Sequence, residues 1–252
     1  MIIDTHCHAG LHKYEPIESL LYHMEETNVE KAVLIQHGGE FDNSYHIECM
    51  NKFPNYFASA MLVSPDDEGD SIHKWAEQGI VGIRLGASSR ALNSNPLVHW
   101  STANQLGLVV SALGSPQAFL SQEFAEVLQR YPNLHIIIEH LAGVDNGNPE
   151  TLKLLEKVLE LSEHEQLSIK LPGFGEFCDL PYPFQEIPKF AEMTLEAFGP
   201  RRMMWGSDYP PVTTREGYKH SLEFPMKYFS KLSEDERSWI FGKSAFESWH
   251  FT

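Results

Sequence analysis

Eight short apolar runs recur along the chain of 252 residues, and segments of helical character separate them. Several runs are almost continuously apolar, as parallel strands covered on both faces must be. The runs are 2–6, 31–37, 56–62, 80–85, 107–113, 134–140, 167–171 and 202–206. Eight strands alternating with helices in about 250 residues predict one (β/α)8 barrel, a TIM barrel, over residues 1–252. A doubly wound open sheet is the alternative.

The connecting segments carry signals for helix starts and ends. Three residues that favour the N-cap position each precede a proline: Asn95, Ser115 and Asn148. Gly107 lies where a helix should end before the next strand. Three leucines at helical spacing predict a buried helix face: Leu152, Leu155 and Leu159.

Composition excludes some classes of function. The formal net charge is −16 and no basic run exists, so the chain should bind neither nucleic acid nor an anionic membrane. The three cysteines (Cys7, Cys49 and Cys178) follow no pattern, which favours a reducing compartment. No apolar stretch approaches 18 residues. We therefore expect a cytoplasmic protein that acts on a small molecule, as a monomer or a homo-oligomer.

His6 and His8 stand at the end of the first apolar run. Side chains alternate along a strand, so the two imidazoles should project from the same face. Two neighbouring imidazoles at the open end of a buried strand can chelate a divalent metal ion. Alone, such a pair is weak evidence for a site.

Further polar residues fall near the ends of other predicted strands. In a (β/α)8 barrel the active site lies where the strands end, so these side chains should converge on one mouth. The residues are His6, His8, Gln36, His37, Arg84, His140, Lys170 and Asp208. This shared position is the strongest argument from the sequence that the protein is an enzyme.

Each of these residues also has a structural interpretation. His140 is a candidate metal ligand or catalytic base, but it could be a hydrogen-bonded barrel histidine. Asp208 is a candidate catalytic residue and metal ligand, but it could cap a turn before the prolines that follow. Lys170 and Arg84 could hold a substrate carboxylate or form structural ion pairs. His37 is a weaker candidate for substrate binding.

Taken together, the motifs resemble the amidohydrolase superfamily, and within it the amidohydrolase 2 branch that contains lactonases of sugar acids and dicarboxylates. The matching segments are 4–8 (DTHCH), 41–45 (FDNSY), 78–85 (QGIVGIRL), 130–133 (RYPN), 138–143 (IEHLAG), 169–171 (IKL), 205–210 (WGSDYP) and 240–245 (IFGKSA). The resemblance implies a (β/α)8 barrel with a site built from His6, His8, His140 and Asp208. It also implies zinc as the usual metal, and Asp208 as the group that takes a proton from the attacking water.

The chain departs from the wider superfamily at three strands. Ser111 and its neighbours stand where many relatives carry a ligand, and Arg84 replaces a bridging lysine or glutamate, which argues against two metal ions. Lys170 stands where decarboxylase-type relatives carry a histidine, which argues against their chemistry. Some members of the lactonase branch work without metal, and these residues allow that as well.

The preferred hypothesis is a hydrolase of a small anionic lactone or related ester. One divalent metal ion, expected to be zinc, would be held by His6, His8 and Asp208, with His140 beside it. Asp208 or His140 would accept a proton from water, while Lys170, Arg84 and His37 would bind substrate. A metal-free variant, a metal-dependent decarboxylase of a small unsaturated or aromatic acid, and a non-enzymatic binder are the alternatives. The segment 172–186 is either a lid or a packed connector.

Overall fold

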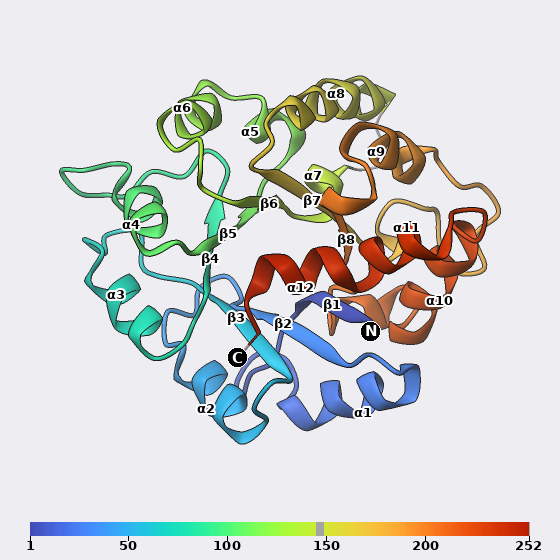
Figure 1. Cartoon of the computed structure of the whole chain (residues 1–252), viewed down its shortest axis with the longest axis horizontal. Helices are drawn as coiled ribbons and strands as arrows, with labels where there is room; N and C mark the ends of the chain where they lie inside the picture. The colour runs from blue at the N-terminus through green and yellow to red at the C-terminus, as the bar shows by residue number, and fades with distance from the viewer. Residues whose placement is uncertain (145–148, 252) are drawn as a thin grey trace.

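The computed structural model describes residues 1–144 and 149–251, and its eight parallel strands form a nearly closed barrel surrounded by helices (Figure 1). The strands are β1 (Ile3–Cys7), β2 (Lys31–Ile35), β3 (Phe57–Met61), β4 (Gly82–Gly86), β5 (Val109–Leu113), β6 (Ile136–Ile138), β7 (Leu167–Leu171) and β8 (Met203–Trp205). They pair in chain order from β1 to β8. The (β/α)8 barrel predicted from the sequence is thus confirmed.

Hydrogen bonds between β1 and the chain that follows β8 bring the two ends of the sheet together. The amide of Asp208 donates to the carbonyl of His6 over 2.9 Å, and the amide of His8 donates to the carbonyl of Tyr209 over 2.7 Å. The hydroxyl of Thr5 donates to the carbonyl of Trp205 over 2.7 Å. This closure places Asp208 beside His6 and His8, the two histidines at the end of β1.

Helices surround the ring of strands (Figure 1), and buried residues on most of them join its apolar core. They are α1 (Ile17–Thr27), α2 (Ser44–Lys52), α3 (Asp70–Glu77), α4 (Val98–Leu106), α5 (Pro116–Phe119), α6 (Gln122–Arg130), α7 (His140–Gly143), α8 (Pro149–Glu160), α9 (Phe190–Phe198), α10 (Tyr218–Tyr228), α11 (Glu234–Ser238) and α12 (Ser244–Trp249). Shorter turns are η1 (Leu161–Glu163), η2 (Phe174–Glu176), η3 (Pro200–Arg202), η4 (Pro211–Thr214) and the π-helical η5 (Trp239–Lys243). Within the described residues no helix is both long and apolar enough to cross a membrane.

The predicted helix signals were partly correct. Ser115 caps α5 and accepts a hydrogen bond from the amide of Ala118, and Gly107 ends α4 with a φ of 65°. The prediction for Asn95 was wrong, because α4 begins at Val98. Asn95 instead closes the preceding turn, where its carbonyl accepts from the amide of Val98. Asn148 lies outside the described residues.

The helix α8 buries a different stripe from the one predicted. Leu155 and Leu159 are buried, as expected, but Leu152 is 44% exposed. The buried stripe starts instead at Thr151, four residues before Leu155. Leu152 lies about 100° around the helix axis from Thr151 and therefore faces away from the barrel.

A separate apolar cluster fills the inside of the barrel. It combines inward-facing strand residues with two residues of α12, Ala245 and Trp249. In Figure 1 this helix crosses the barrel in the view down its axis. Trp249 lies against Gly82, at the end of the barrel where the strands begin. The opposite end, where the strands stop, is left for polar side chains.

Candidate active site

His6 and His8 lie side by side at the end of β1, as their spacing predicted. Both side chains are buried, and their rings meet edge to face with centroids 4.9 Å apart. His8 Nδ1 lies 2.6 Å from the carbonyl oxygen of Ile35. Because a carbonyl can only accept, Nδ1 donates to it, and Nε2 is left to face the site. Nε2 lies 3.5 Å from Asp208 Oδ1.

His6 has one ring nitrogen engaged and one free. Its Nδ1 lies 3.1 Å from Lys170 Nζ. Its Nε2 is buried without a hydrogen-bond partner among the described residues, and it faces Asp208 Oδ1 over 3.9 Å. Burial, reinforced by the charge of Lys170, holds the pKa of His6 well below its usual value. The ring is therefore neutral, and a buried polar atom points into the mouth of the barrel.

A buried network of charges lies beneath His6. Lys170 Nζ donates to the hydroxyl of Ser111 over 2.9 Å, and this hydroxyl donates to Glu139 over 2.7 Å. Arg84 holds both oxygens of Glu139 in a two-pronged ion pair, with a shortest distance of 2.7 Å. Burial lowers the pKa of Lys170 to about 8. The structure places Lys170 under the site and Arg84 on Glu139, so both have the structural partners that the sequence left open.

His140 begins a left-handed turn instead of ending a strand. β6 stops at Ile138, and four successive residues from His140 to Gly143 have positive φ angles. Strand 134–140 was therefore predicted too long. Left-handed backbone costs about 1–2 kcal/mol for each residue with a Cβ. Asp208 also has a positive φ, 59°. Such strain concentrates at functional sites.

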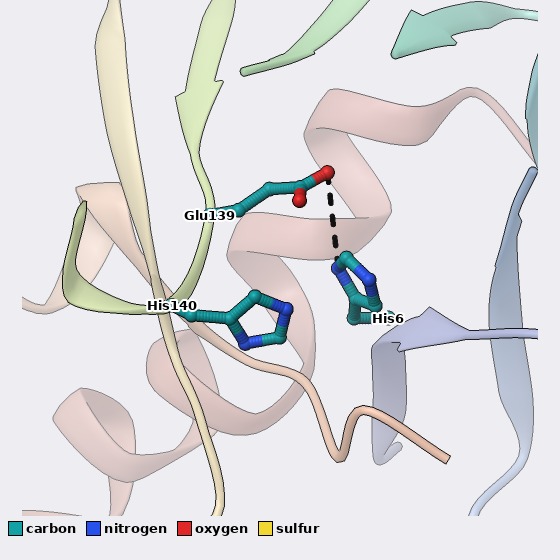
Figure 2. Close-up of side chains that lie close together, drawn as sticks. All are labelled: His6, Glu139 and His140. Atoms are coloured by element: carbon teal, nitrogen blue, oxygen red, sulfur yellow. Dashed lines mark ion pairs between the residues drawn. The ribbon is translucent and has the colours of Figure 1, made fainter. Parts of the chain in front are cut away.

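The turn brings the His140 ring against His6, with ring centroids 4.2 Å apart (Figure 2). Figure 2 also shows Glu139 above the two rings in this view, and its Oε1 lies 4.0 Å from His6 Nδ1. Asp208 completes the cluster. Burial works to raise the pKa of Asp208, but the contact with His8 and the charges of His140, His8 and Arg215 outweigh it and lower the pKa. Asp208 is thus an ionised carboxylate among imidazoles.

Three more residues of the site had not been predicted, and they come from loops. Arg215 Nη2 lies 3.2 Å from Asp208 Oδ2, and Glu176 Oε2 lies 3.5 Å from His140 Nδ1. Tyr14 stacks on His8 at a centroid distance of 5.0 Å. His37, predicted to bind substrate, contacts only the edge of this group, where its ring meets Tyr14. Loop residues follow no periodic pattern, so the sequence gives no signal for them.

Two groups of side chains in the described part of the chain could hold a metal ion: His6, His8 and Asp208, and His6, Glu139 and His140. Glu139 already has its oxygens on Arg84 and Ser111, which disfavours the second group. The first group fits a divalent ion, because Nε2 of His8 and the unpartnered Nε2 of His6 both face Asp208. For His6 Nε2 to be a ligand, Nδ1 must carry the ring proton. The amino group of Lys170 must then be neutral and accept a hydrogen bond from Nδ1.

Solved structures with the same fold are known. A probable 2-pyrone-4,6-dicarboxylic acid hydrolase from Acinetobacter baumannii, crystallised with citric acid, is 20% identical, with 99% of each chain covered and a TM-score of 0.79. An amidohydrolase from Burkholderia multivorans with bound zinc is 17% identical over 100% of each chain, with a TM-score of 0.83. The 5-carboxyvanillate decarboxylase LigW from Sphingomonas paucimobilis is 13% identical over 100% of this chain and 99% of its own, with a TM-score of 0.66.

These structural likenesses show the fold alone. No protein of curated function matches the sequence at a significant level. The family profile described as amidohydrolase matches residues 3–251, which is nearly the whole chain. The chain therefore belongs to the amidohydrolase family, as its motifs had predicted.

Proposed function

We propose that this protein hydrolyses a small anionic lactone or a related ester, with Asp208 as the base that activates water. One observation carries the proposal: the Asp208 carboxylate is 3.5 Å from His8 Nε2 and 3.9 Å from His6 Nε2, at the mouth of the barrel. The lowered pKa of Asp208 keeps it ionised at neutral pH. An ionised carboxylate among hydrogen-bonding rings can accept a proton from an attacking water.

The arrangement gives each side chain a separate role. Arg215 holds Asp208 Oδ2, so that Oδ1 is the oxygen aimed at the histidines. His6 Nε2 and the ring of His140 line the position where the lactone carbonyl would lie. An N–H directed at the carbonyl oxygen stabilises the negative charge that develops there.

A divalent metal ion, for which we propose zinc, would be held by His6, His8 and Asp208, with His140 beside it. When bound, such an ion lowers the pKa of water and polarises a carbonyl. Without it, His6 can donate its Nε2 proton to the carbonyl, because Lys170 then donates to Nδ1. Asp208 accepts the proton from water in either case.

The anionic class of substrate is supported by the cations around the mouth. Arg84 and Arg215 are partly exposed, and the outer N–H groups of a guanidinium suit a carboxylate. The Acinetobacter baumannii protein was crystallised with citric acid, a small polycarboxylate. His37 lies behind Tyr14 at the rim and would contact only a larger substrate. A decarboxylase is the weaker candidate, since β7 carries Lys170 where decarboxylase-type relatives carry a histidine.

The test combines metal analysis with a screen for hydrolysis. Plasma mass spectrometry of the untagged protein should find about one equivalent of zinc, which the His6→Ala/His8→Ala variant should lack. A panel of lactones with carboxylate groups should then release acid in a pH-indicator assay. Protein that contains no metal after reconstitution but still opens lactones would support the metal-free form. Release of carbon dioxide from unsaturated acids, without lactone hydrolysis, would contradict the proposal.

Replacement of Asp208 gives the sharpest single test. Asp208→Asn should lower kcat by about 10²–10⁴-fold, because an amide cannot accept the proton. Asparagine keeps the size of the side chain, and the residue lies at the mouth outside the packed layers, so the melting temperature should stay close to that of the wild type. Steady-state kinetics and circular dichroism would measure the two quantities. Turnover near the wild-type rate would remove Asp208 from the mechanism.

A further inference from the structure

The segment that follows β7 brings a carboxylate to His140. Residue Glu176 ends the short turn η2 (Phe174–Glu176). Phe174 beneath it is fully buried and packs on the rings of Phe177, Phe224 and Tyr228. The first part of segment 172–186 is therefore packed against α10.

Glu216 fixes the backbone of this turn. Its Oε1 accepts a hydrogen bond of 3.0 Å from the amide of Gly175. A Cβ at Gly173 or Gly175 would lie 2.3 Å or 2.0 Å from the Glu216 carboxylate, so only glycine allows this approach. The position of the turn thus depends on Glu216 and on aromatic packing, and the carboxylate of Glu176 is not needed for it.

Glu176 and His140 meet through two atoms that have no other hydrogen-bond partner. Glu176 Oε2 lies 3.5 Å from His140 Nδ1. Both atoms are buried without a hydrogen bond within the described residues. Around them lie Arg215, whose Nη2 is 3.6 Å from the same oxygen, and Asp208, which shares that Nη2. The contact is longer than a hydrogen bond, as contacts in ligand-free sites often are before they shorten on binding.

We propose that Glu176 is a positioning residue that sets the tautomer and orientation of His140. Burial raises the pKa of Glu176, and the charge of Arg215, 3.6 Å from its Oε2, opposes that rise. As a carboxylate Glu176 only accepts, so it selects the form of His140 with the proton on Nδ1. The lone pair of Nε2 is then free for the chemistry at the mouth, and a positive charge that forms on the ring is stabilised. This inference rests on the proposed function for its effect on turnover, but the tautomer of His140 is a property of the protein alone.

Three variants separate positioning from support of the fold. Glu176→Leu removes the acceptor, Glu176→Gln keeps an acceptor oxygen without the charge, and Glu216→Gln changes the carboxylate that fixes the turn without touching His140. Nitrogen-15 NMR of the imidazoles reports the tautomer, and a His140→Gln spectrum assigns the His140 signals by difference. We expect a proton on Nδ1 in the wild type and in Glu216→Gln, and its loss from Nδ1 in Glu176→Leu.

With a lactone that the wild type hydrolyses, Glu176→Leu should lower kcat by about 10–100-fold, the usual cost of losing such a partner, and leave KM within about twofold. The kcat of Glu176→Gln should lie between that of Glu176→Leu and that of the wild type. The proposal is overturned if His140 keeps the same tautomer in Glu176→Leu, or if kcat falls only together with the melting temperature and equally in Glu216→Gln. If the wild type hydrolyses no lactone, the proposed function fails, and the NMR result still decides the role of Glu176.

Discussion

Burial limits which roles the charged side chain of Lys170 can have. Its amino group lies under His6, bonded to Ser111, and no part of the residue is exposed. A cation in this place cannot reach a substrate carboxylate at the mouth, but it can determine which nitrogen of His6 carries the proton. Sequence alone could not separate these roles, because both put a lysine near the end of β7.

The variant Lys170→Met should therefore lower kcat and leave KM within about twofold, because it changes His6 and not the substrate contacts. The sequence had suggested that Lys170 holds a substrate carboxylate, and loss of such a contact would instead raise KM. Steady-state kinetics on a lactone that the wild type hydrolyses would measure both constants. A several-fold rise in KM at constant kcat would show instead that Lys170 binds a substrate carboxylate.

His46 should make the protein sensitive to acid. Its side chain is buried, its Nδ1 lies 2.8 Å from Ser59 Oγ, and burial lowers its pKa from 6.5 to about 3. Below pH 6.5 His46 binds a proton in the unfolded chain but not in the folded protein. The stability present above that pH is therefore lost as pH falls towards 3.

Between pH 6.5 and 5 this one group should cost about 2 kcal/mol of unfolding free energy, at about 1.4 kcal/mol per pH unit. Urea unfolding at the two pH values would measure the loss. The His46→Gln variant, which cannot titrate, should lose that much less than the wild type. Equal losses in both proteins would assign the acid sensitivity to other groups.

At the scale of elements, the pattern of apolar and turn residues predicted where the strands begin and end. Every predicted strand boundary lies within two residues of the observed one, since apolar runs and turn residues act over short distances. The end of β6 shows the limit. Its left-handed turn depends on contact with another loop, where a Cβ on Gly143 would lie 2.8 Å from the carbonyl oxygen of Gly114. Glu176 and Arg215 are likewise placed by the packing of loops.

The turn α7 can be tested with a matched pair of glycines. Gly143 and Gly107 have nearly equal φ angles, 66° and 65°, but only Gly143 has atoms close to the position of a Cβ. Gly107→Ala should cost about 1 kcal/mol, the price of a left-handed alanine. Gly143→Ala should cost more by about 1–3 kcal/mol, because the methyl group also forces the backbone of the neighbouring loop to move.

Chemical denaturation would measure both variants. The displaced turn carries His140, so kcat should fall in Gly143→Ala and stay unchanged in Gly107→Ala. Equal effects of the two substitutions on stability and turnover would mean that the contact with Gly114 does not hold the turn.

At the scale of the whole molecule, the C-terminal helix supports the site from the opposite end of the barrel. Trp249 of α12 is fully buried inside the ring of strands, and Lys170 Nζ lies 5.5 Å from the centre of its ring. A cation at this distance from an aromatic face is attracted to it. The charge network thus has Trp249 below it and His6 above it.

This packing predicts a coupling between Trp249 and Gly82. A Cβ on Gly82 would lie 2.7 Å from Cζ3 of Trp249 and 3.0 Å from the carbonyl oxygen of Val109. Gly82→Ala should therefore cost about 1–3 kcal/mol through overpacking. Trp249→Ala should cost about 3–5 kcal/mol through the cavity it leaves.

The double variant should be more stable than the sum of the two losses predicts, because without the indole the methyl group meets only Val109 and Ala60. Urea unfolding of the four proteins gives the coupling energy directly. Strict additivity would mean that the clash lies with the backbone of β5 alone. A positive coupling, with a lowered kcat in Trp249→Ala, would show that the barrel needs its C-terminal helix to hold the charges under the active site.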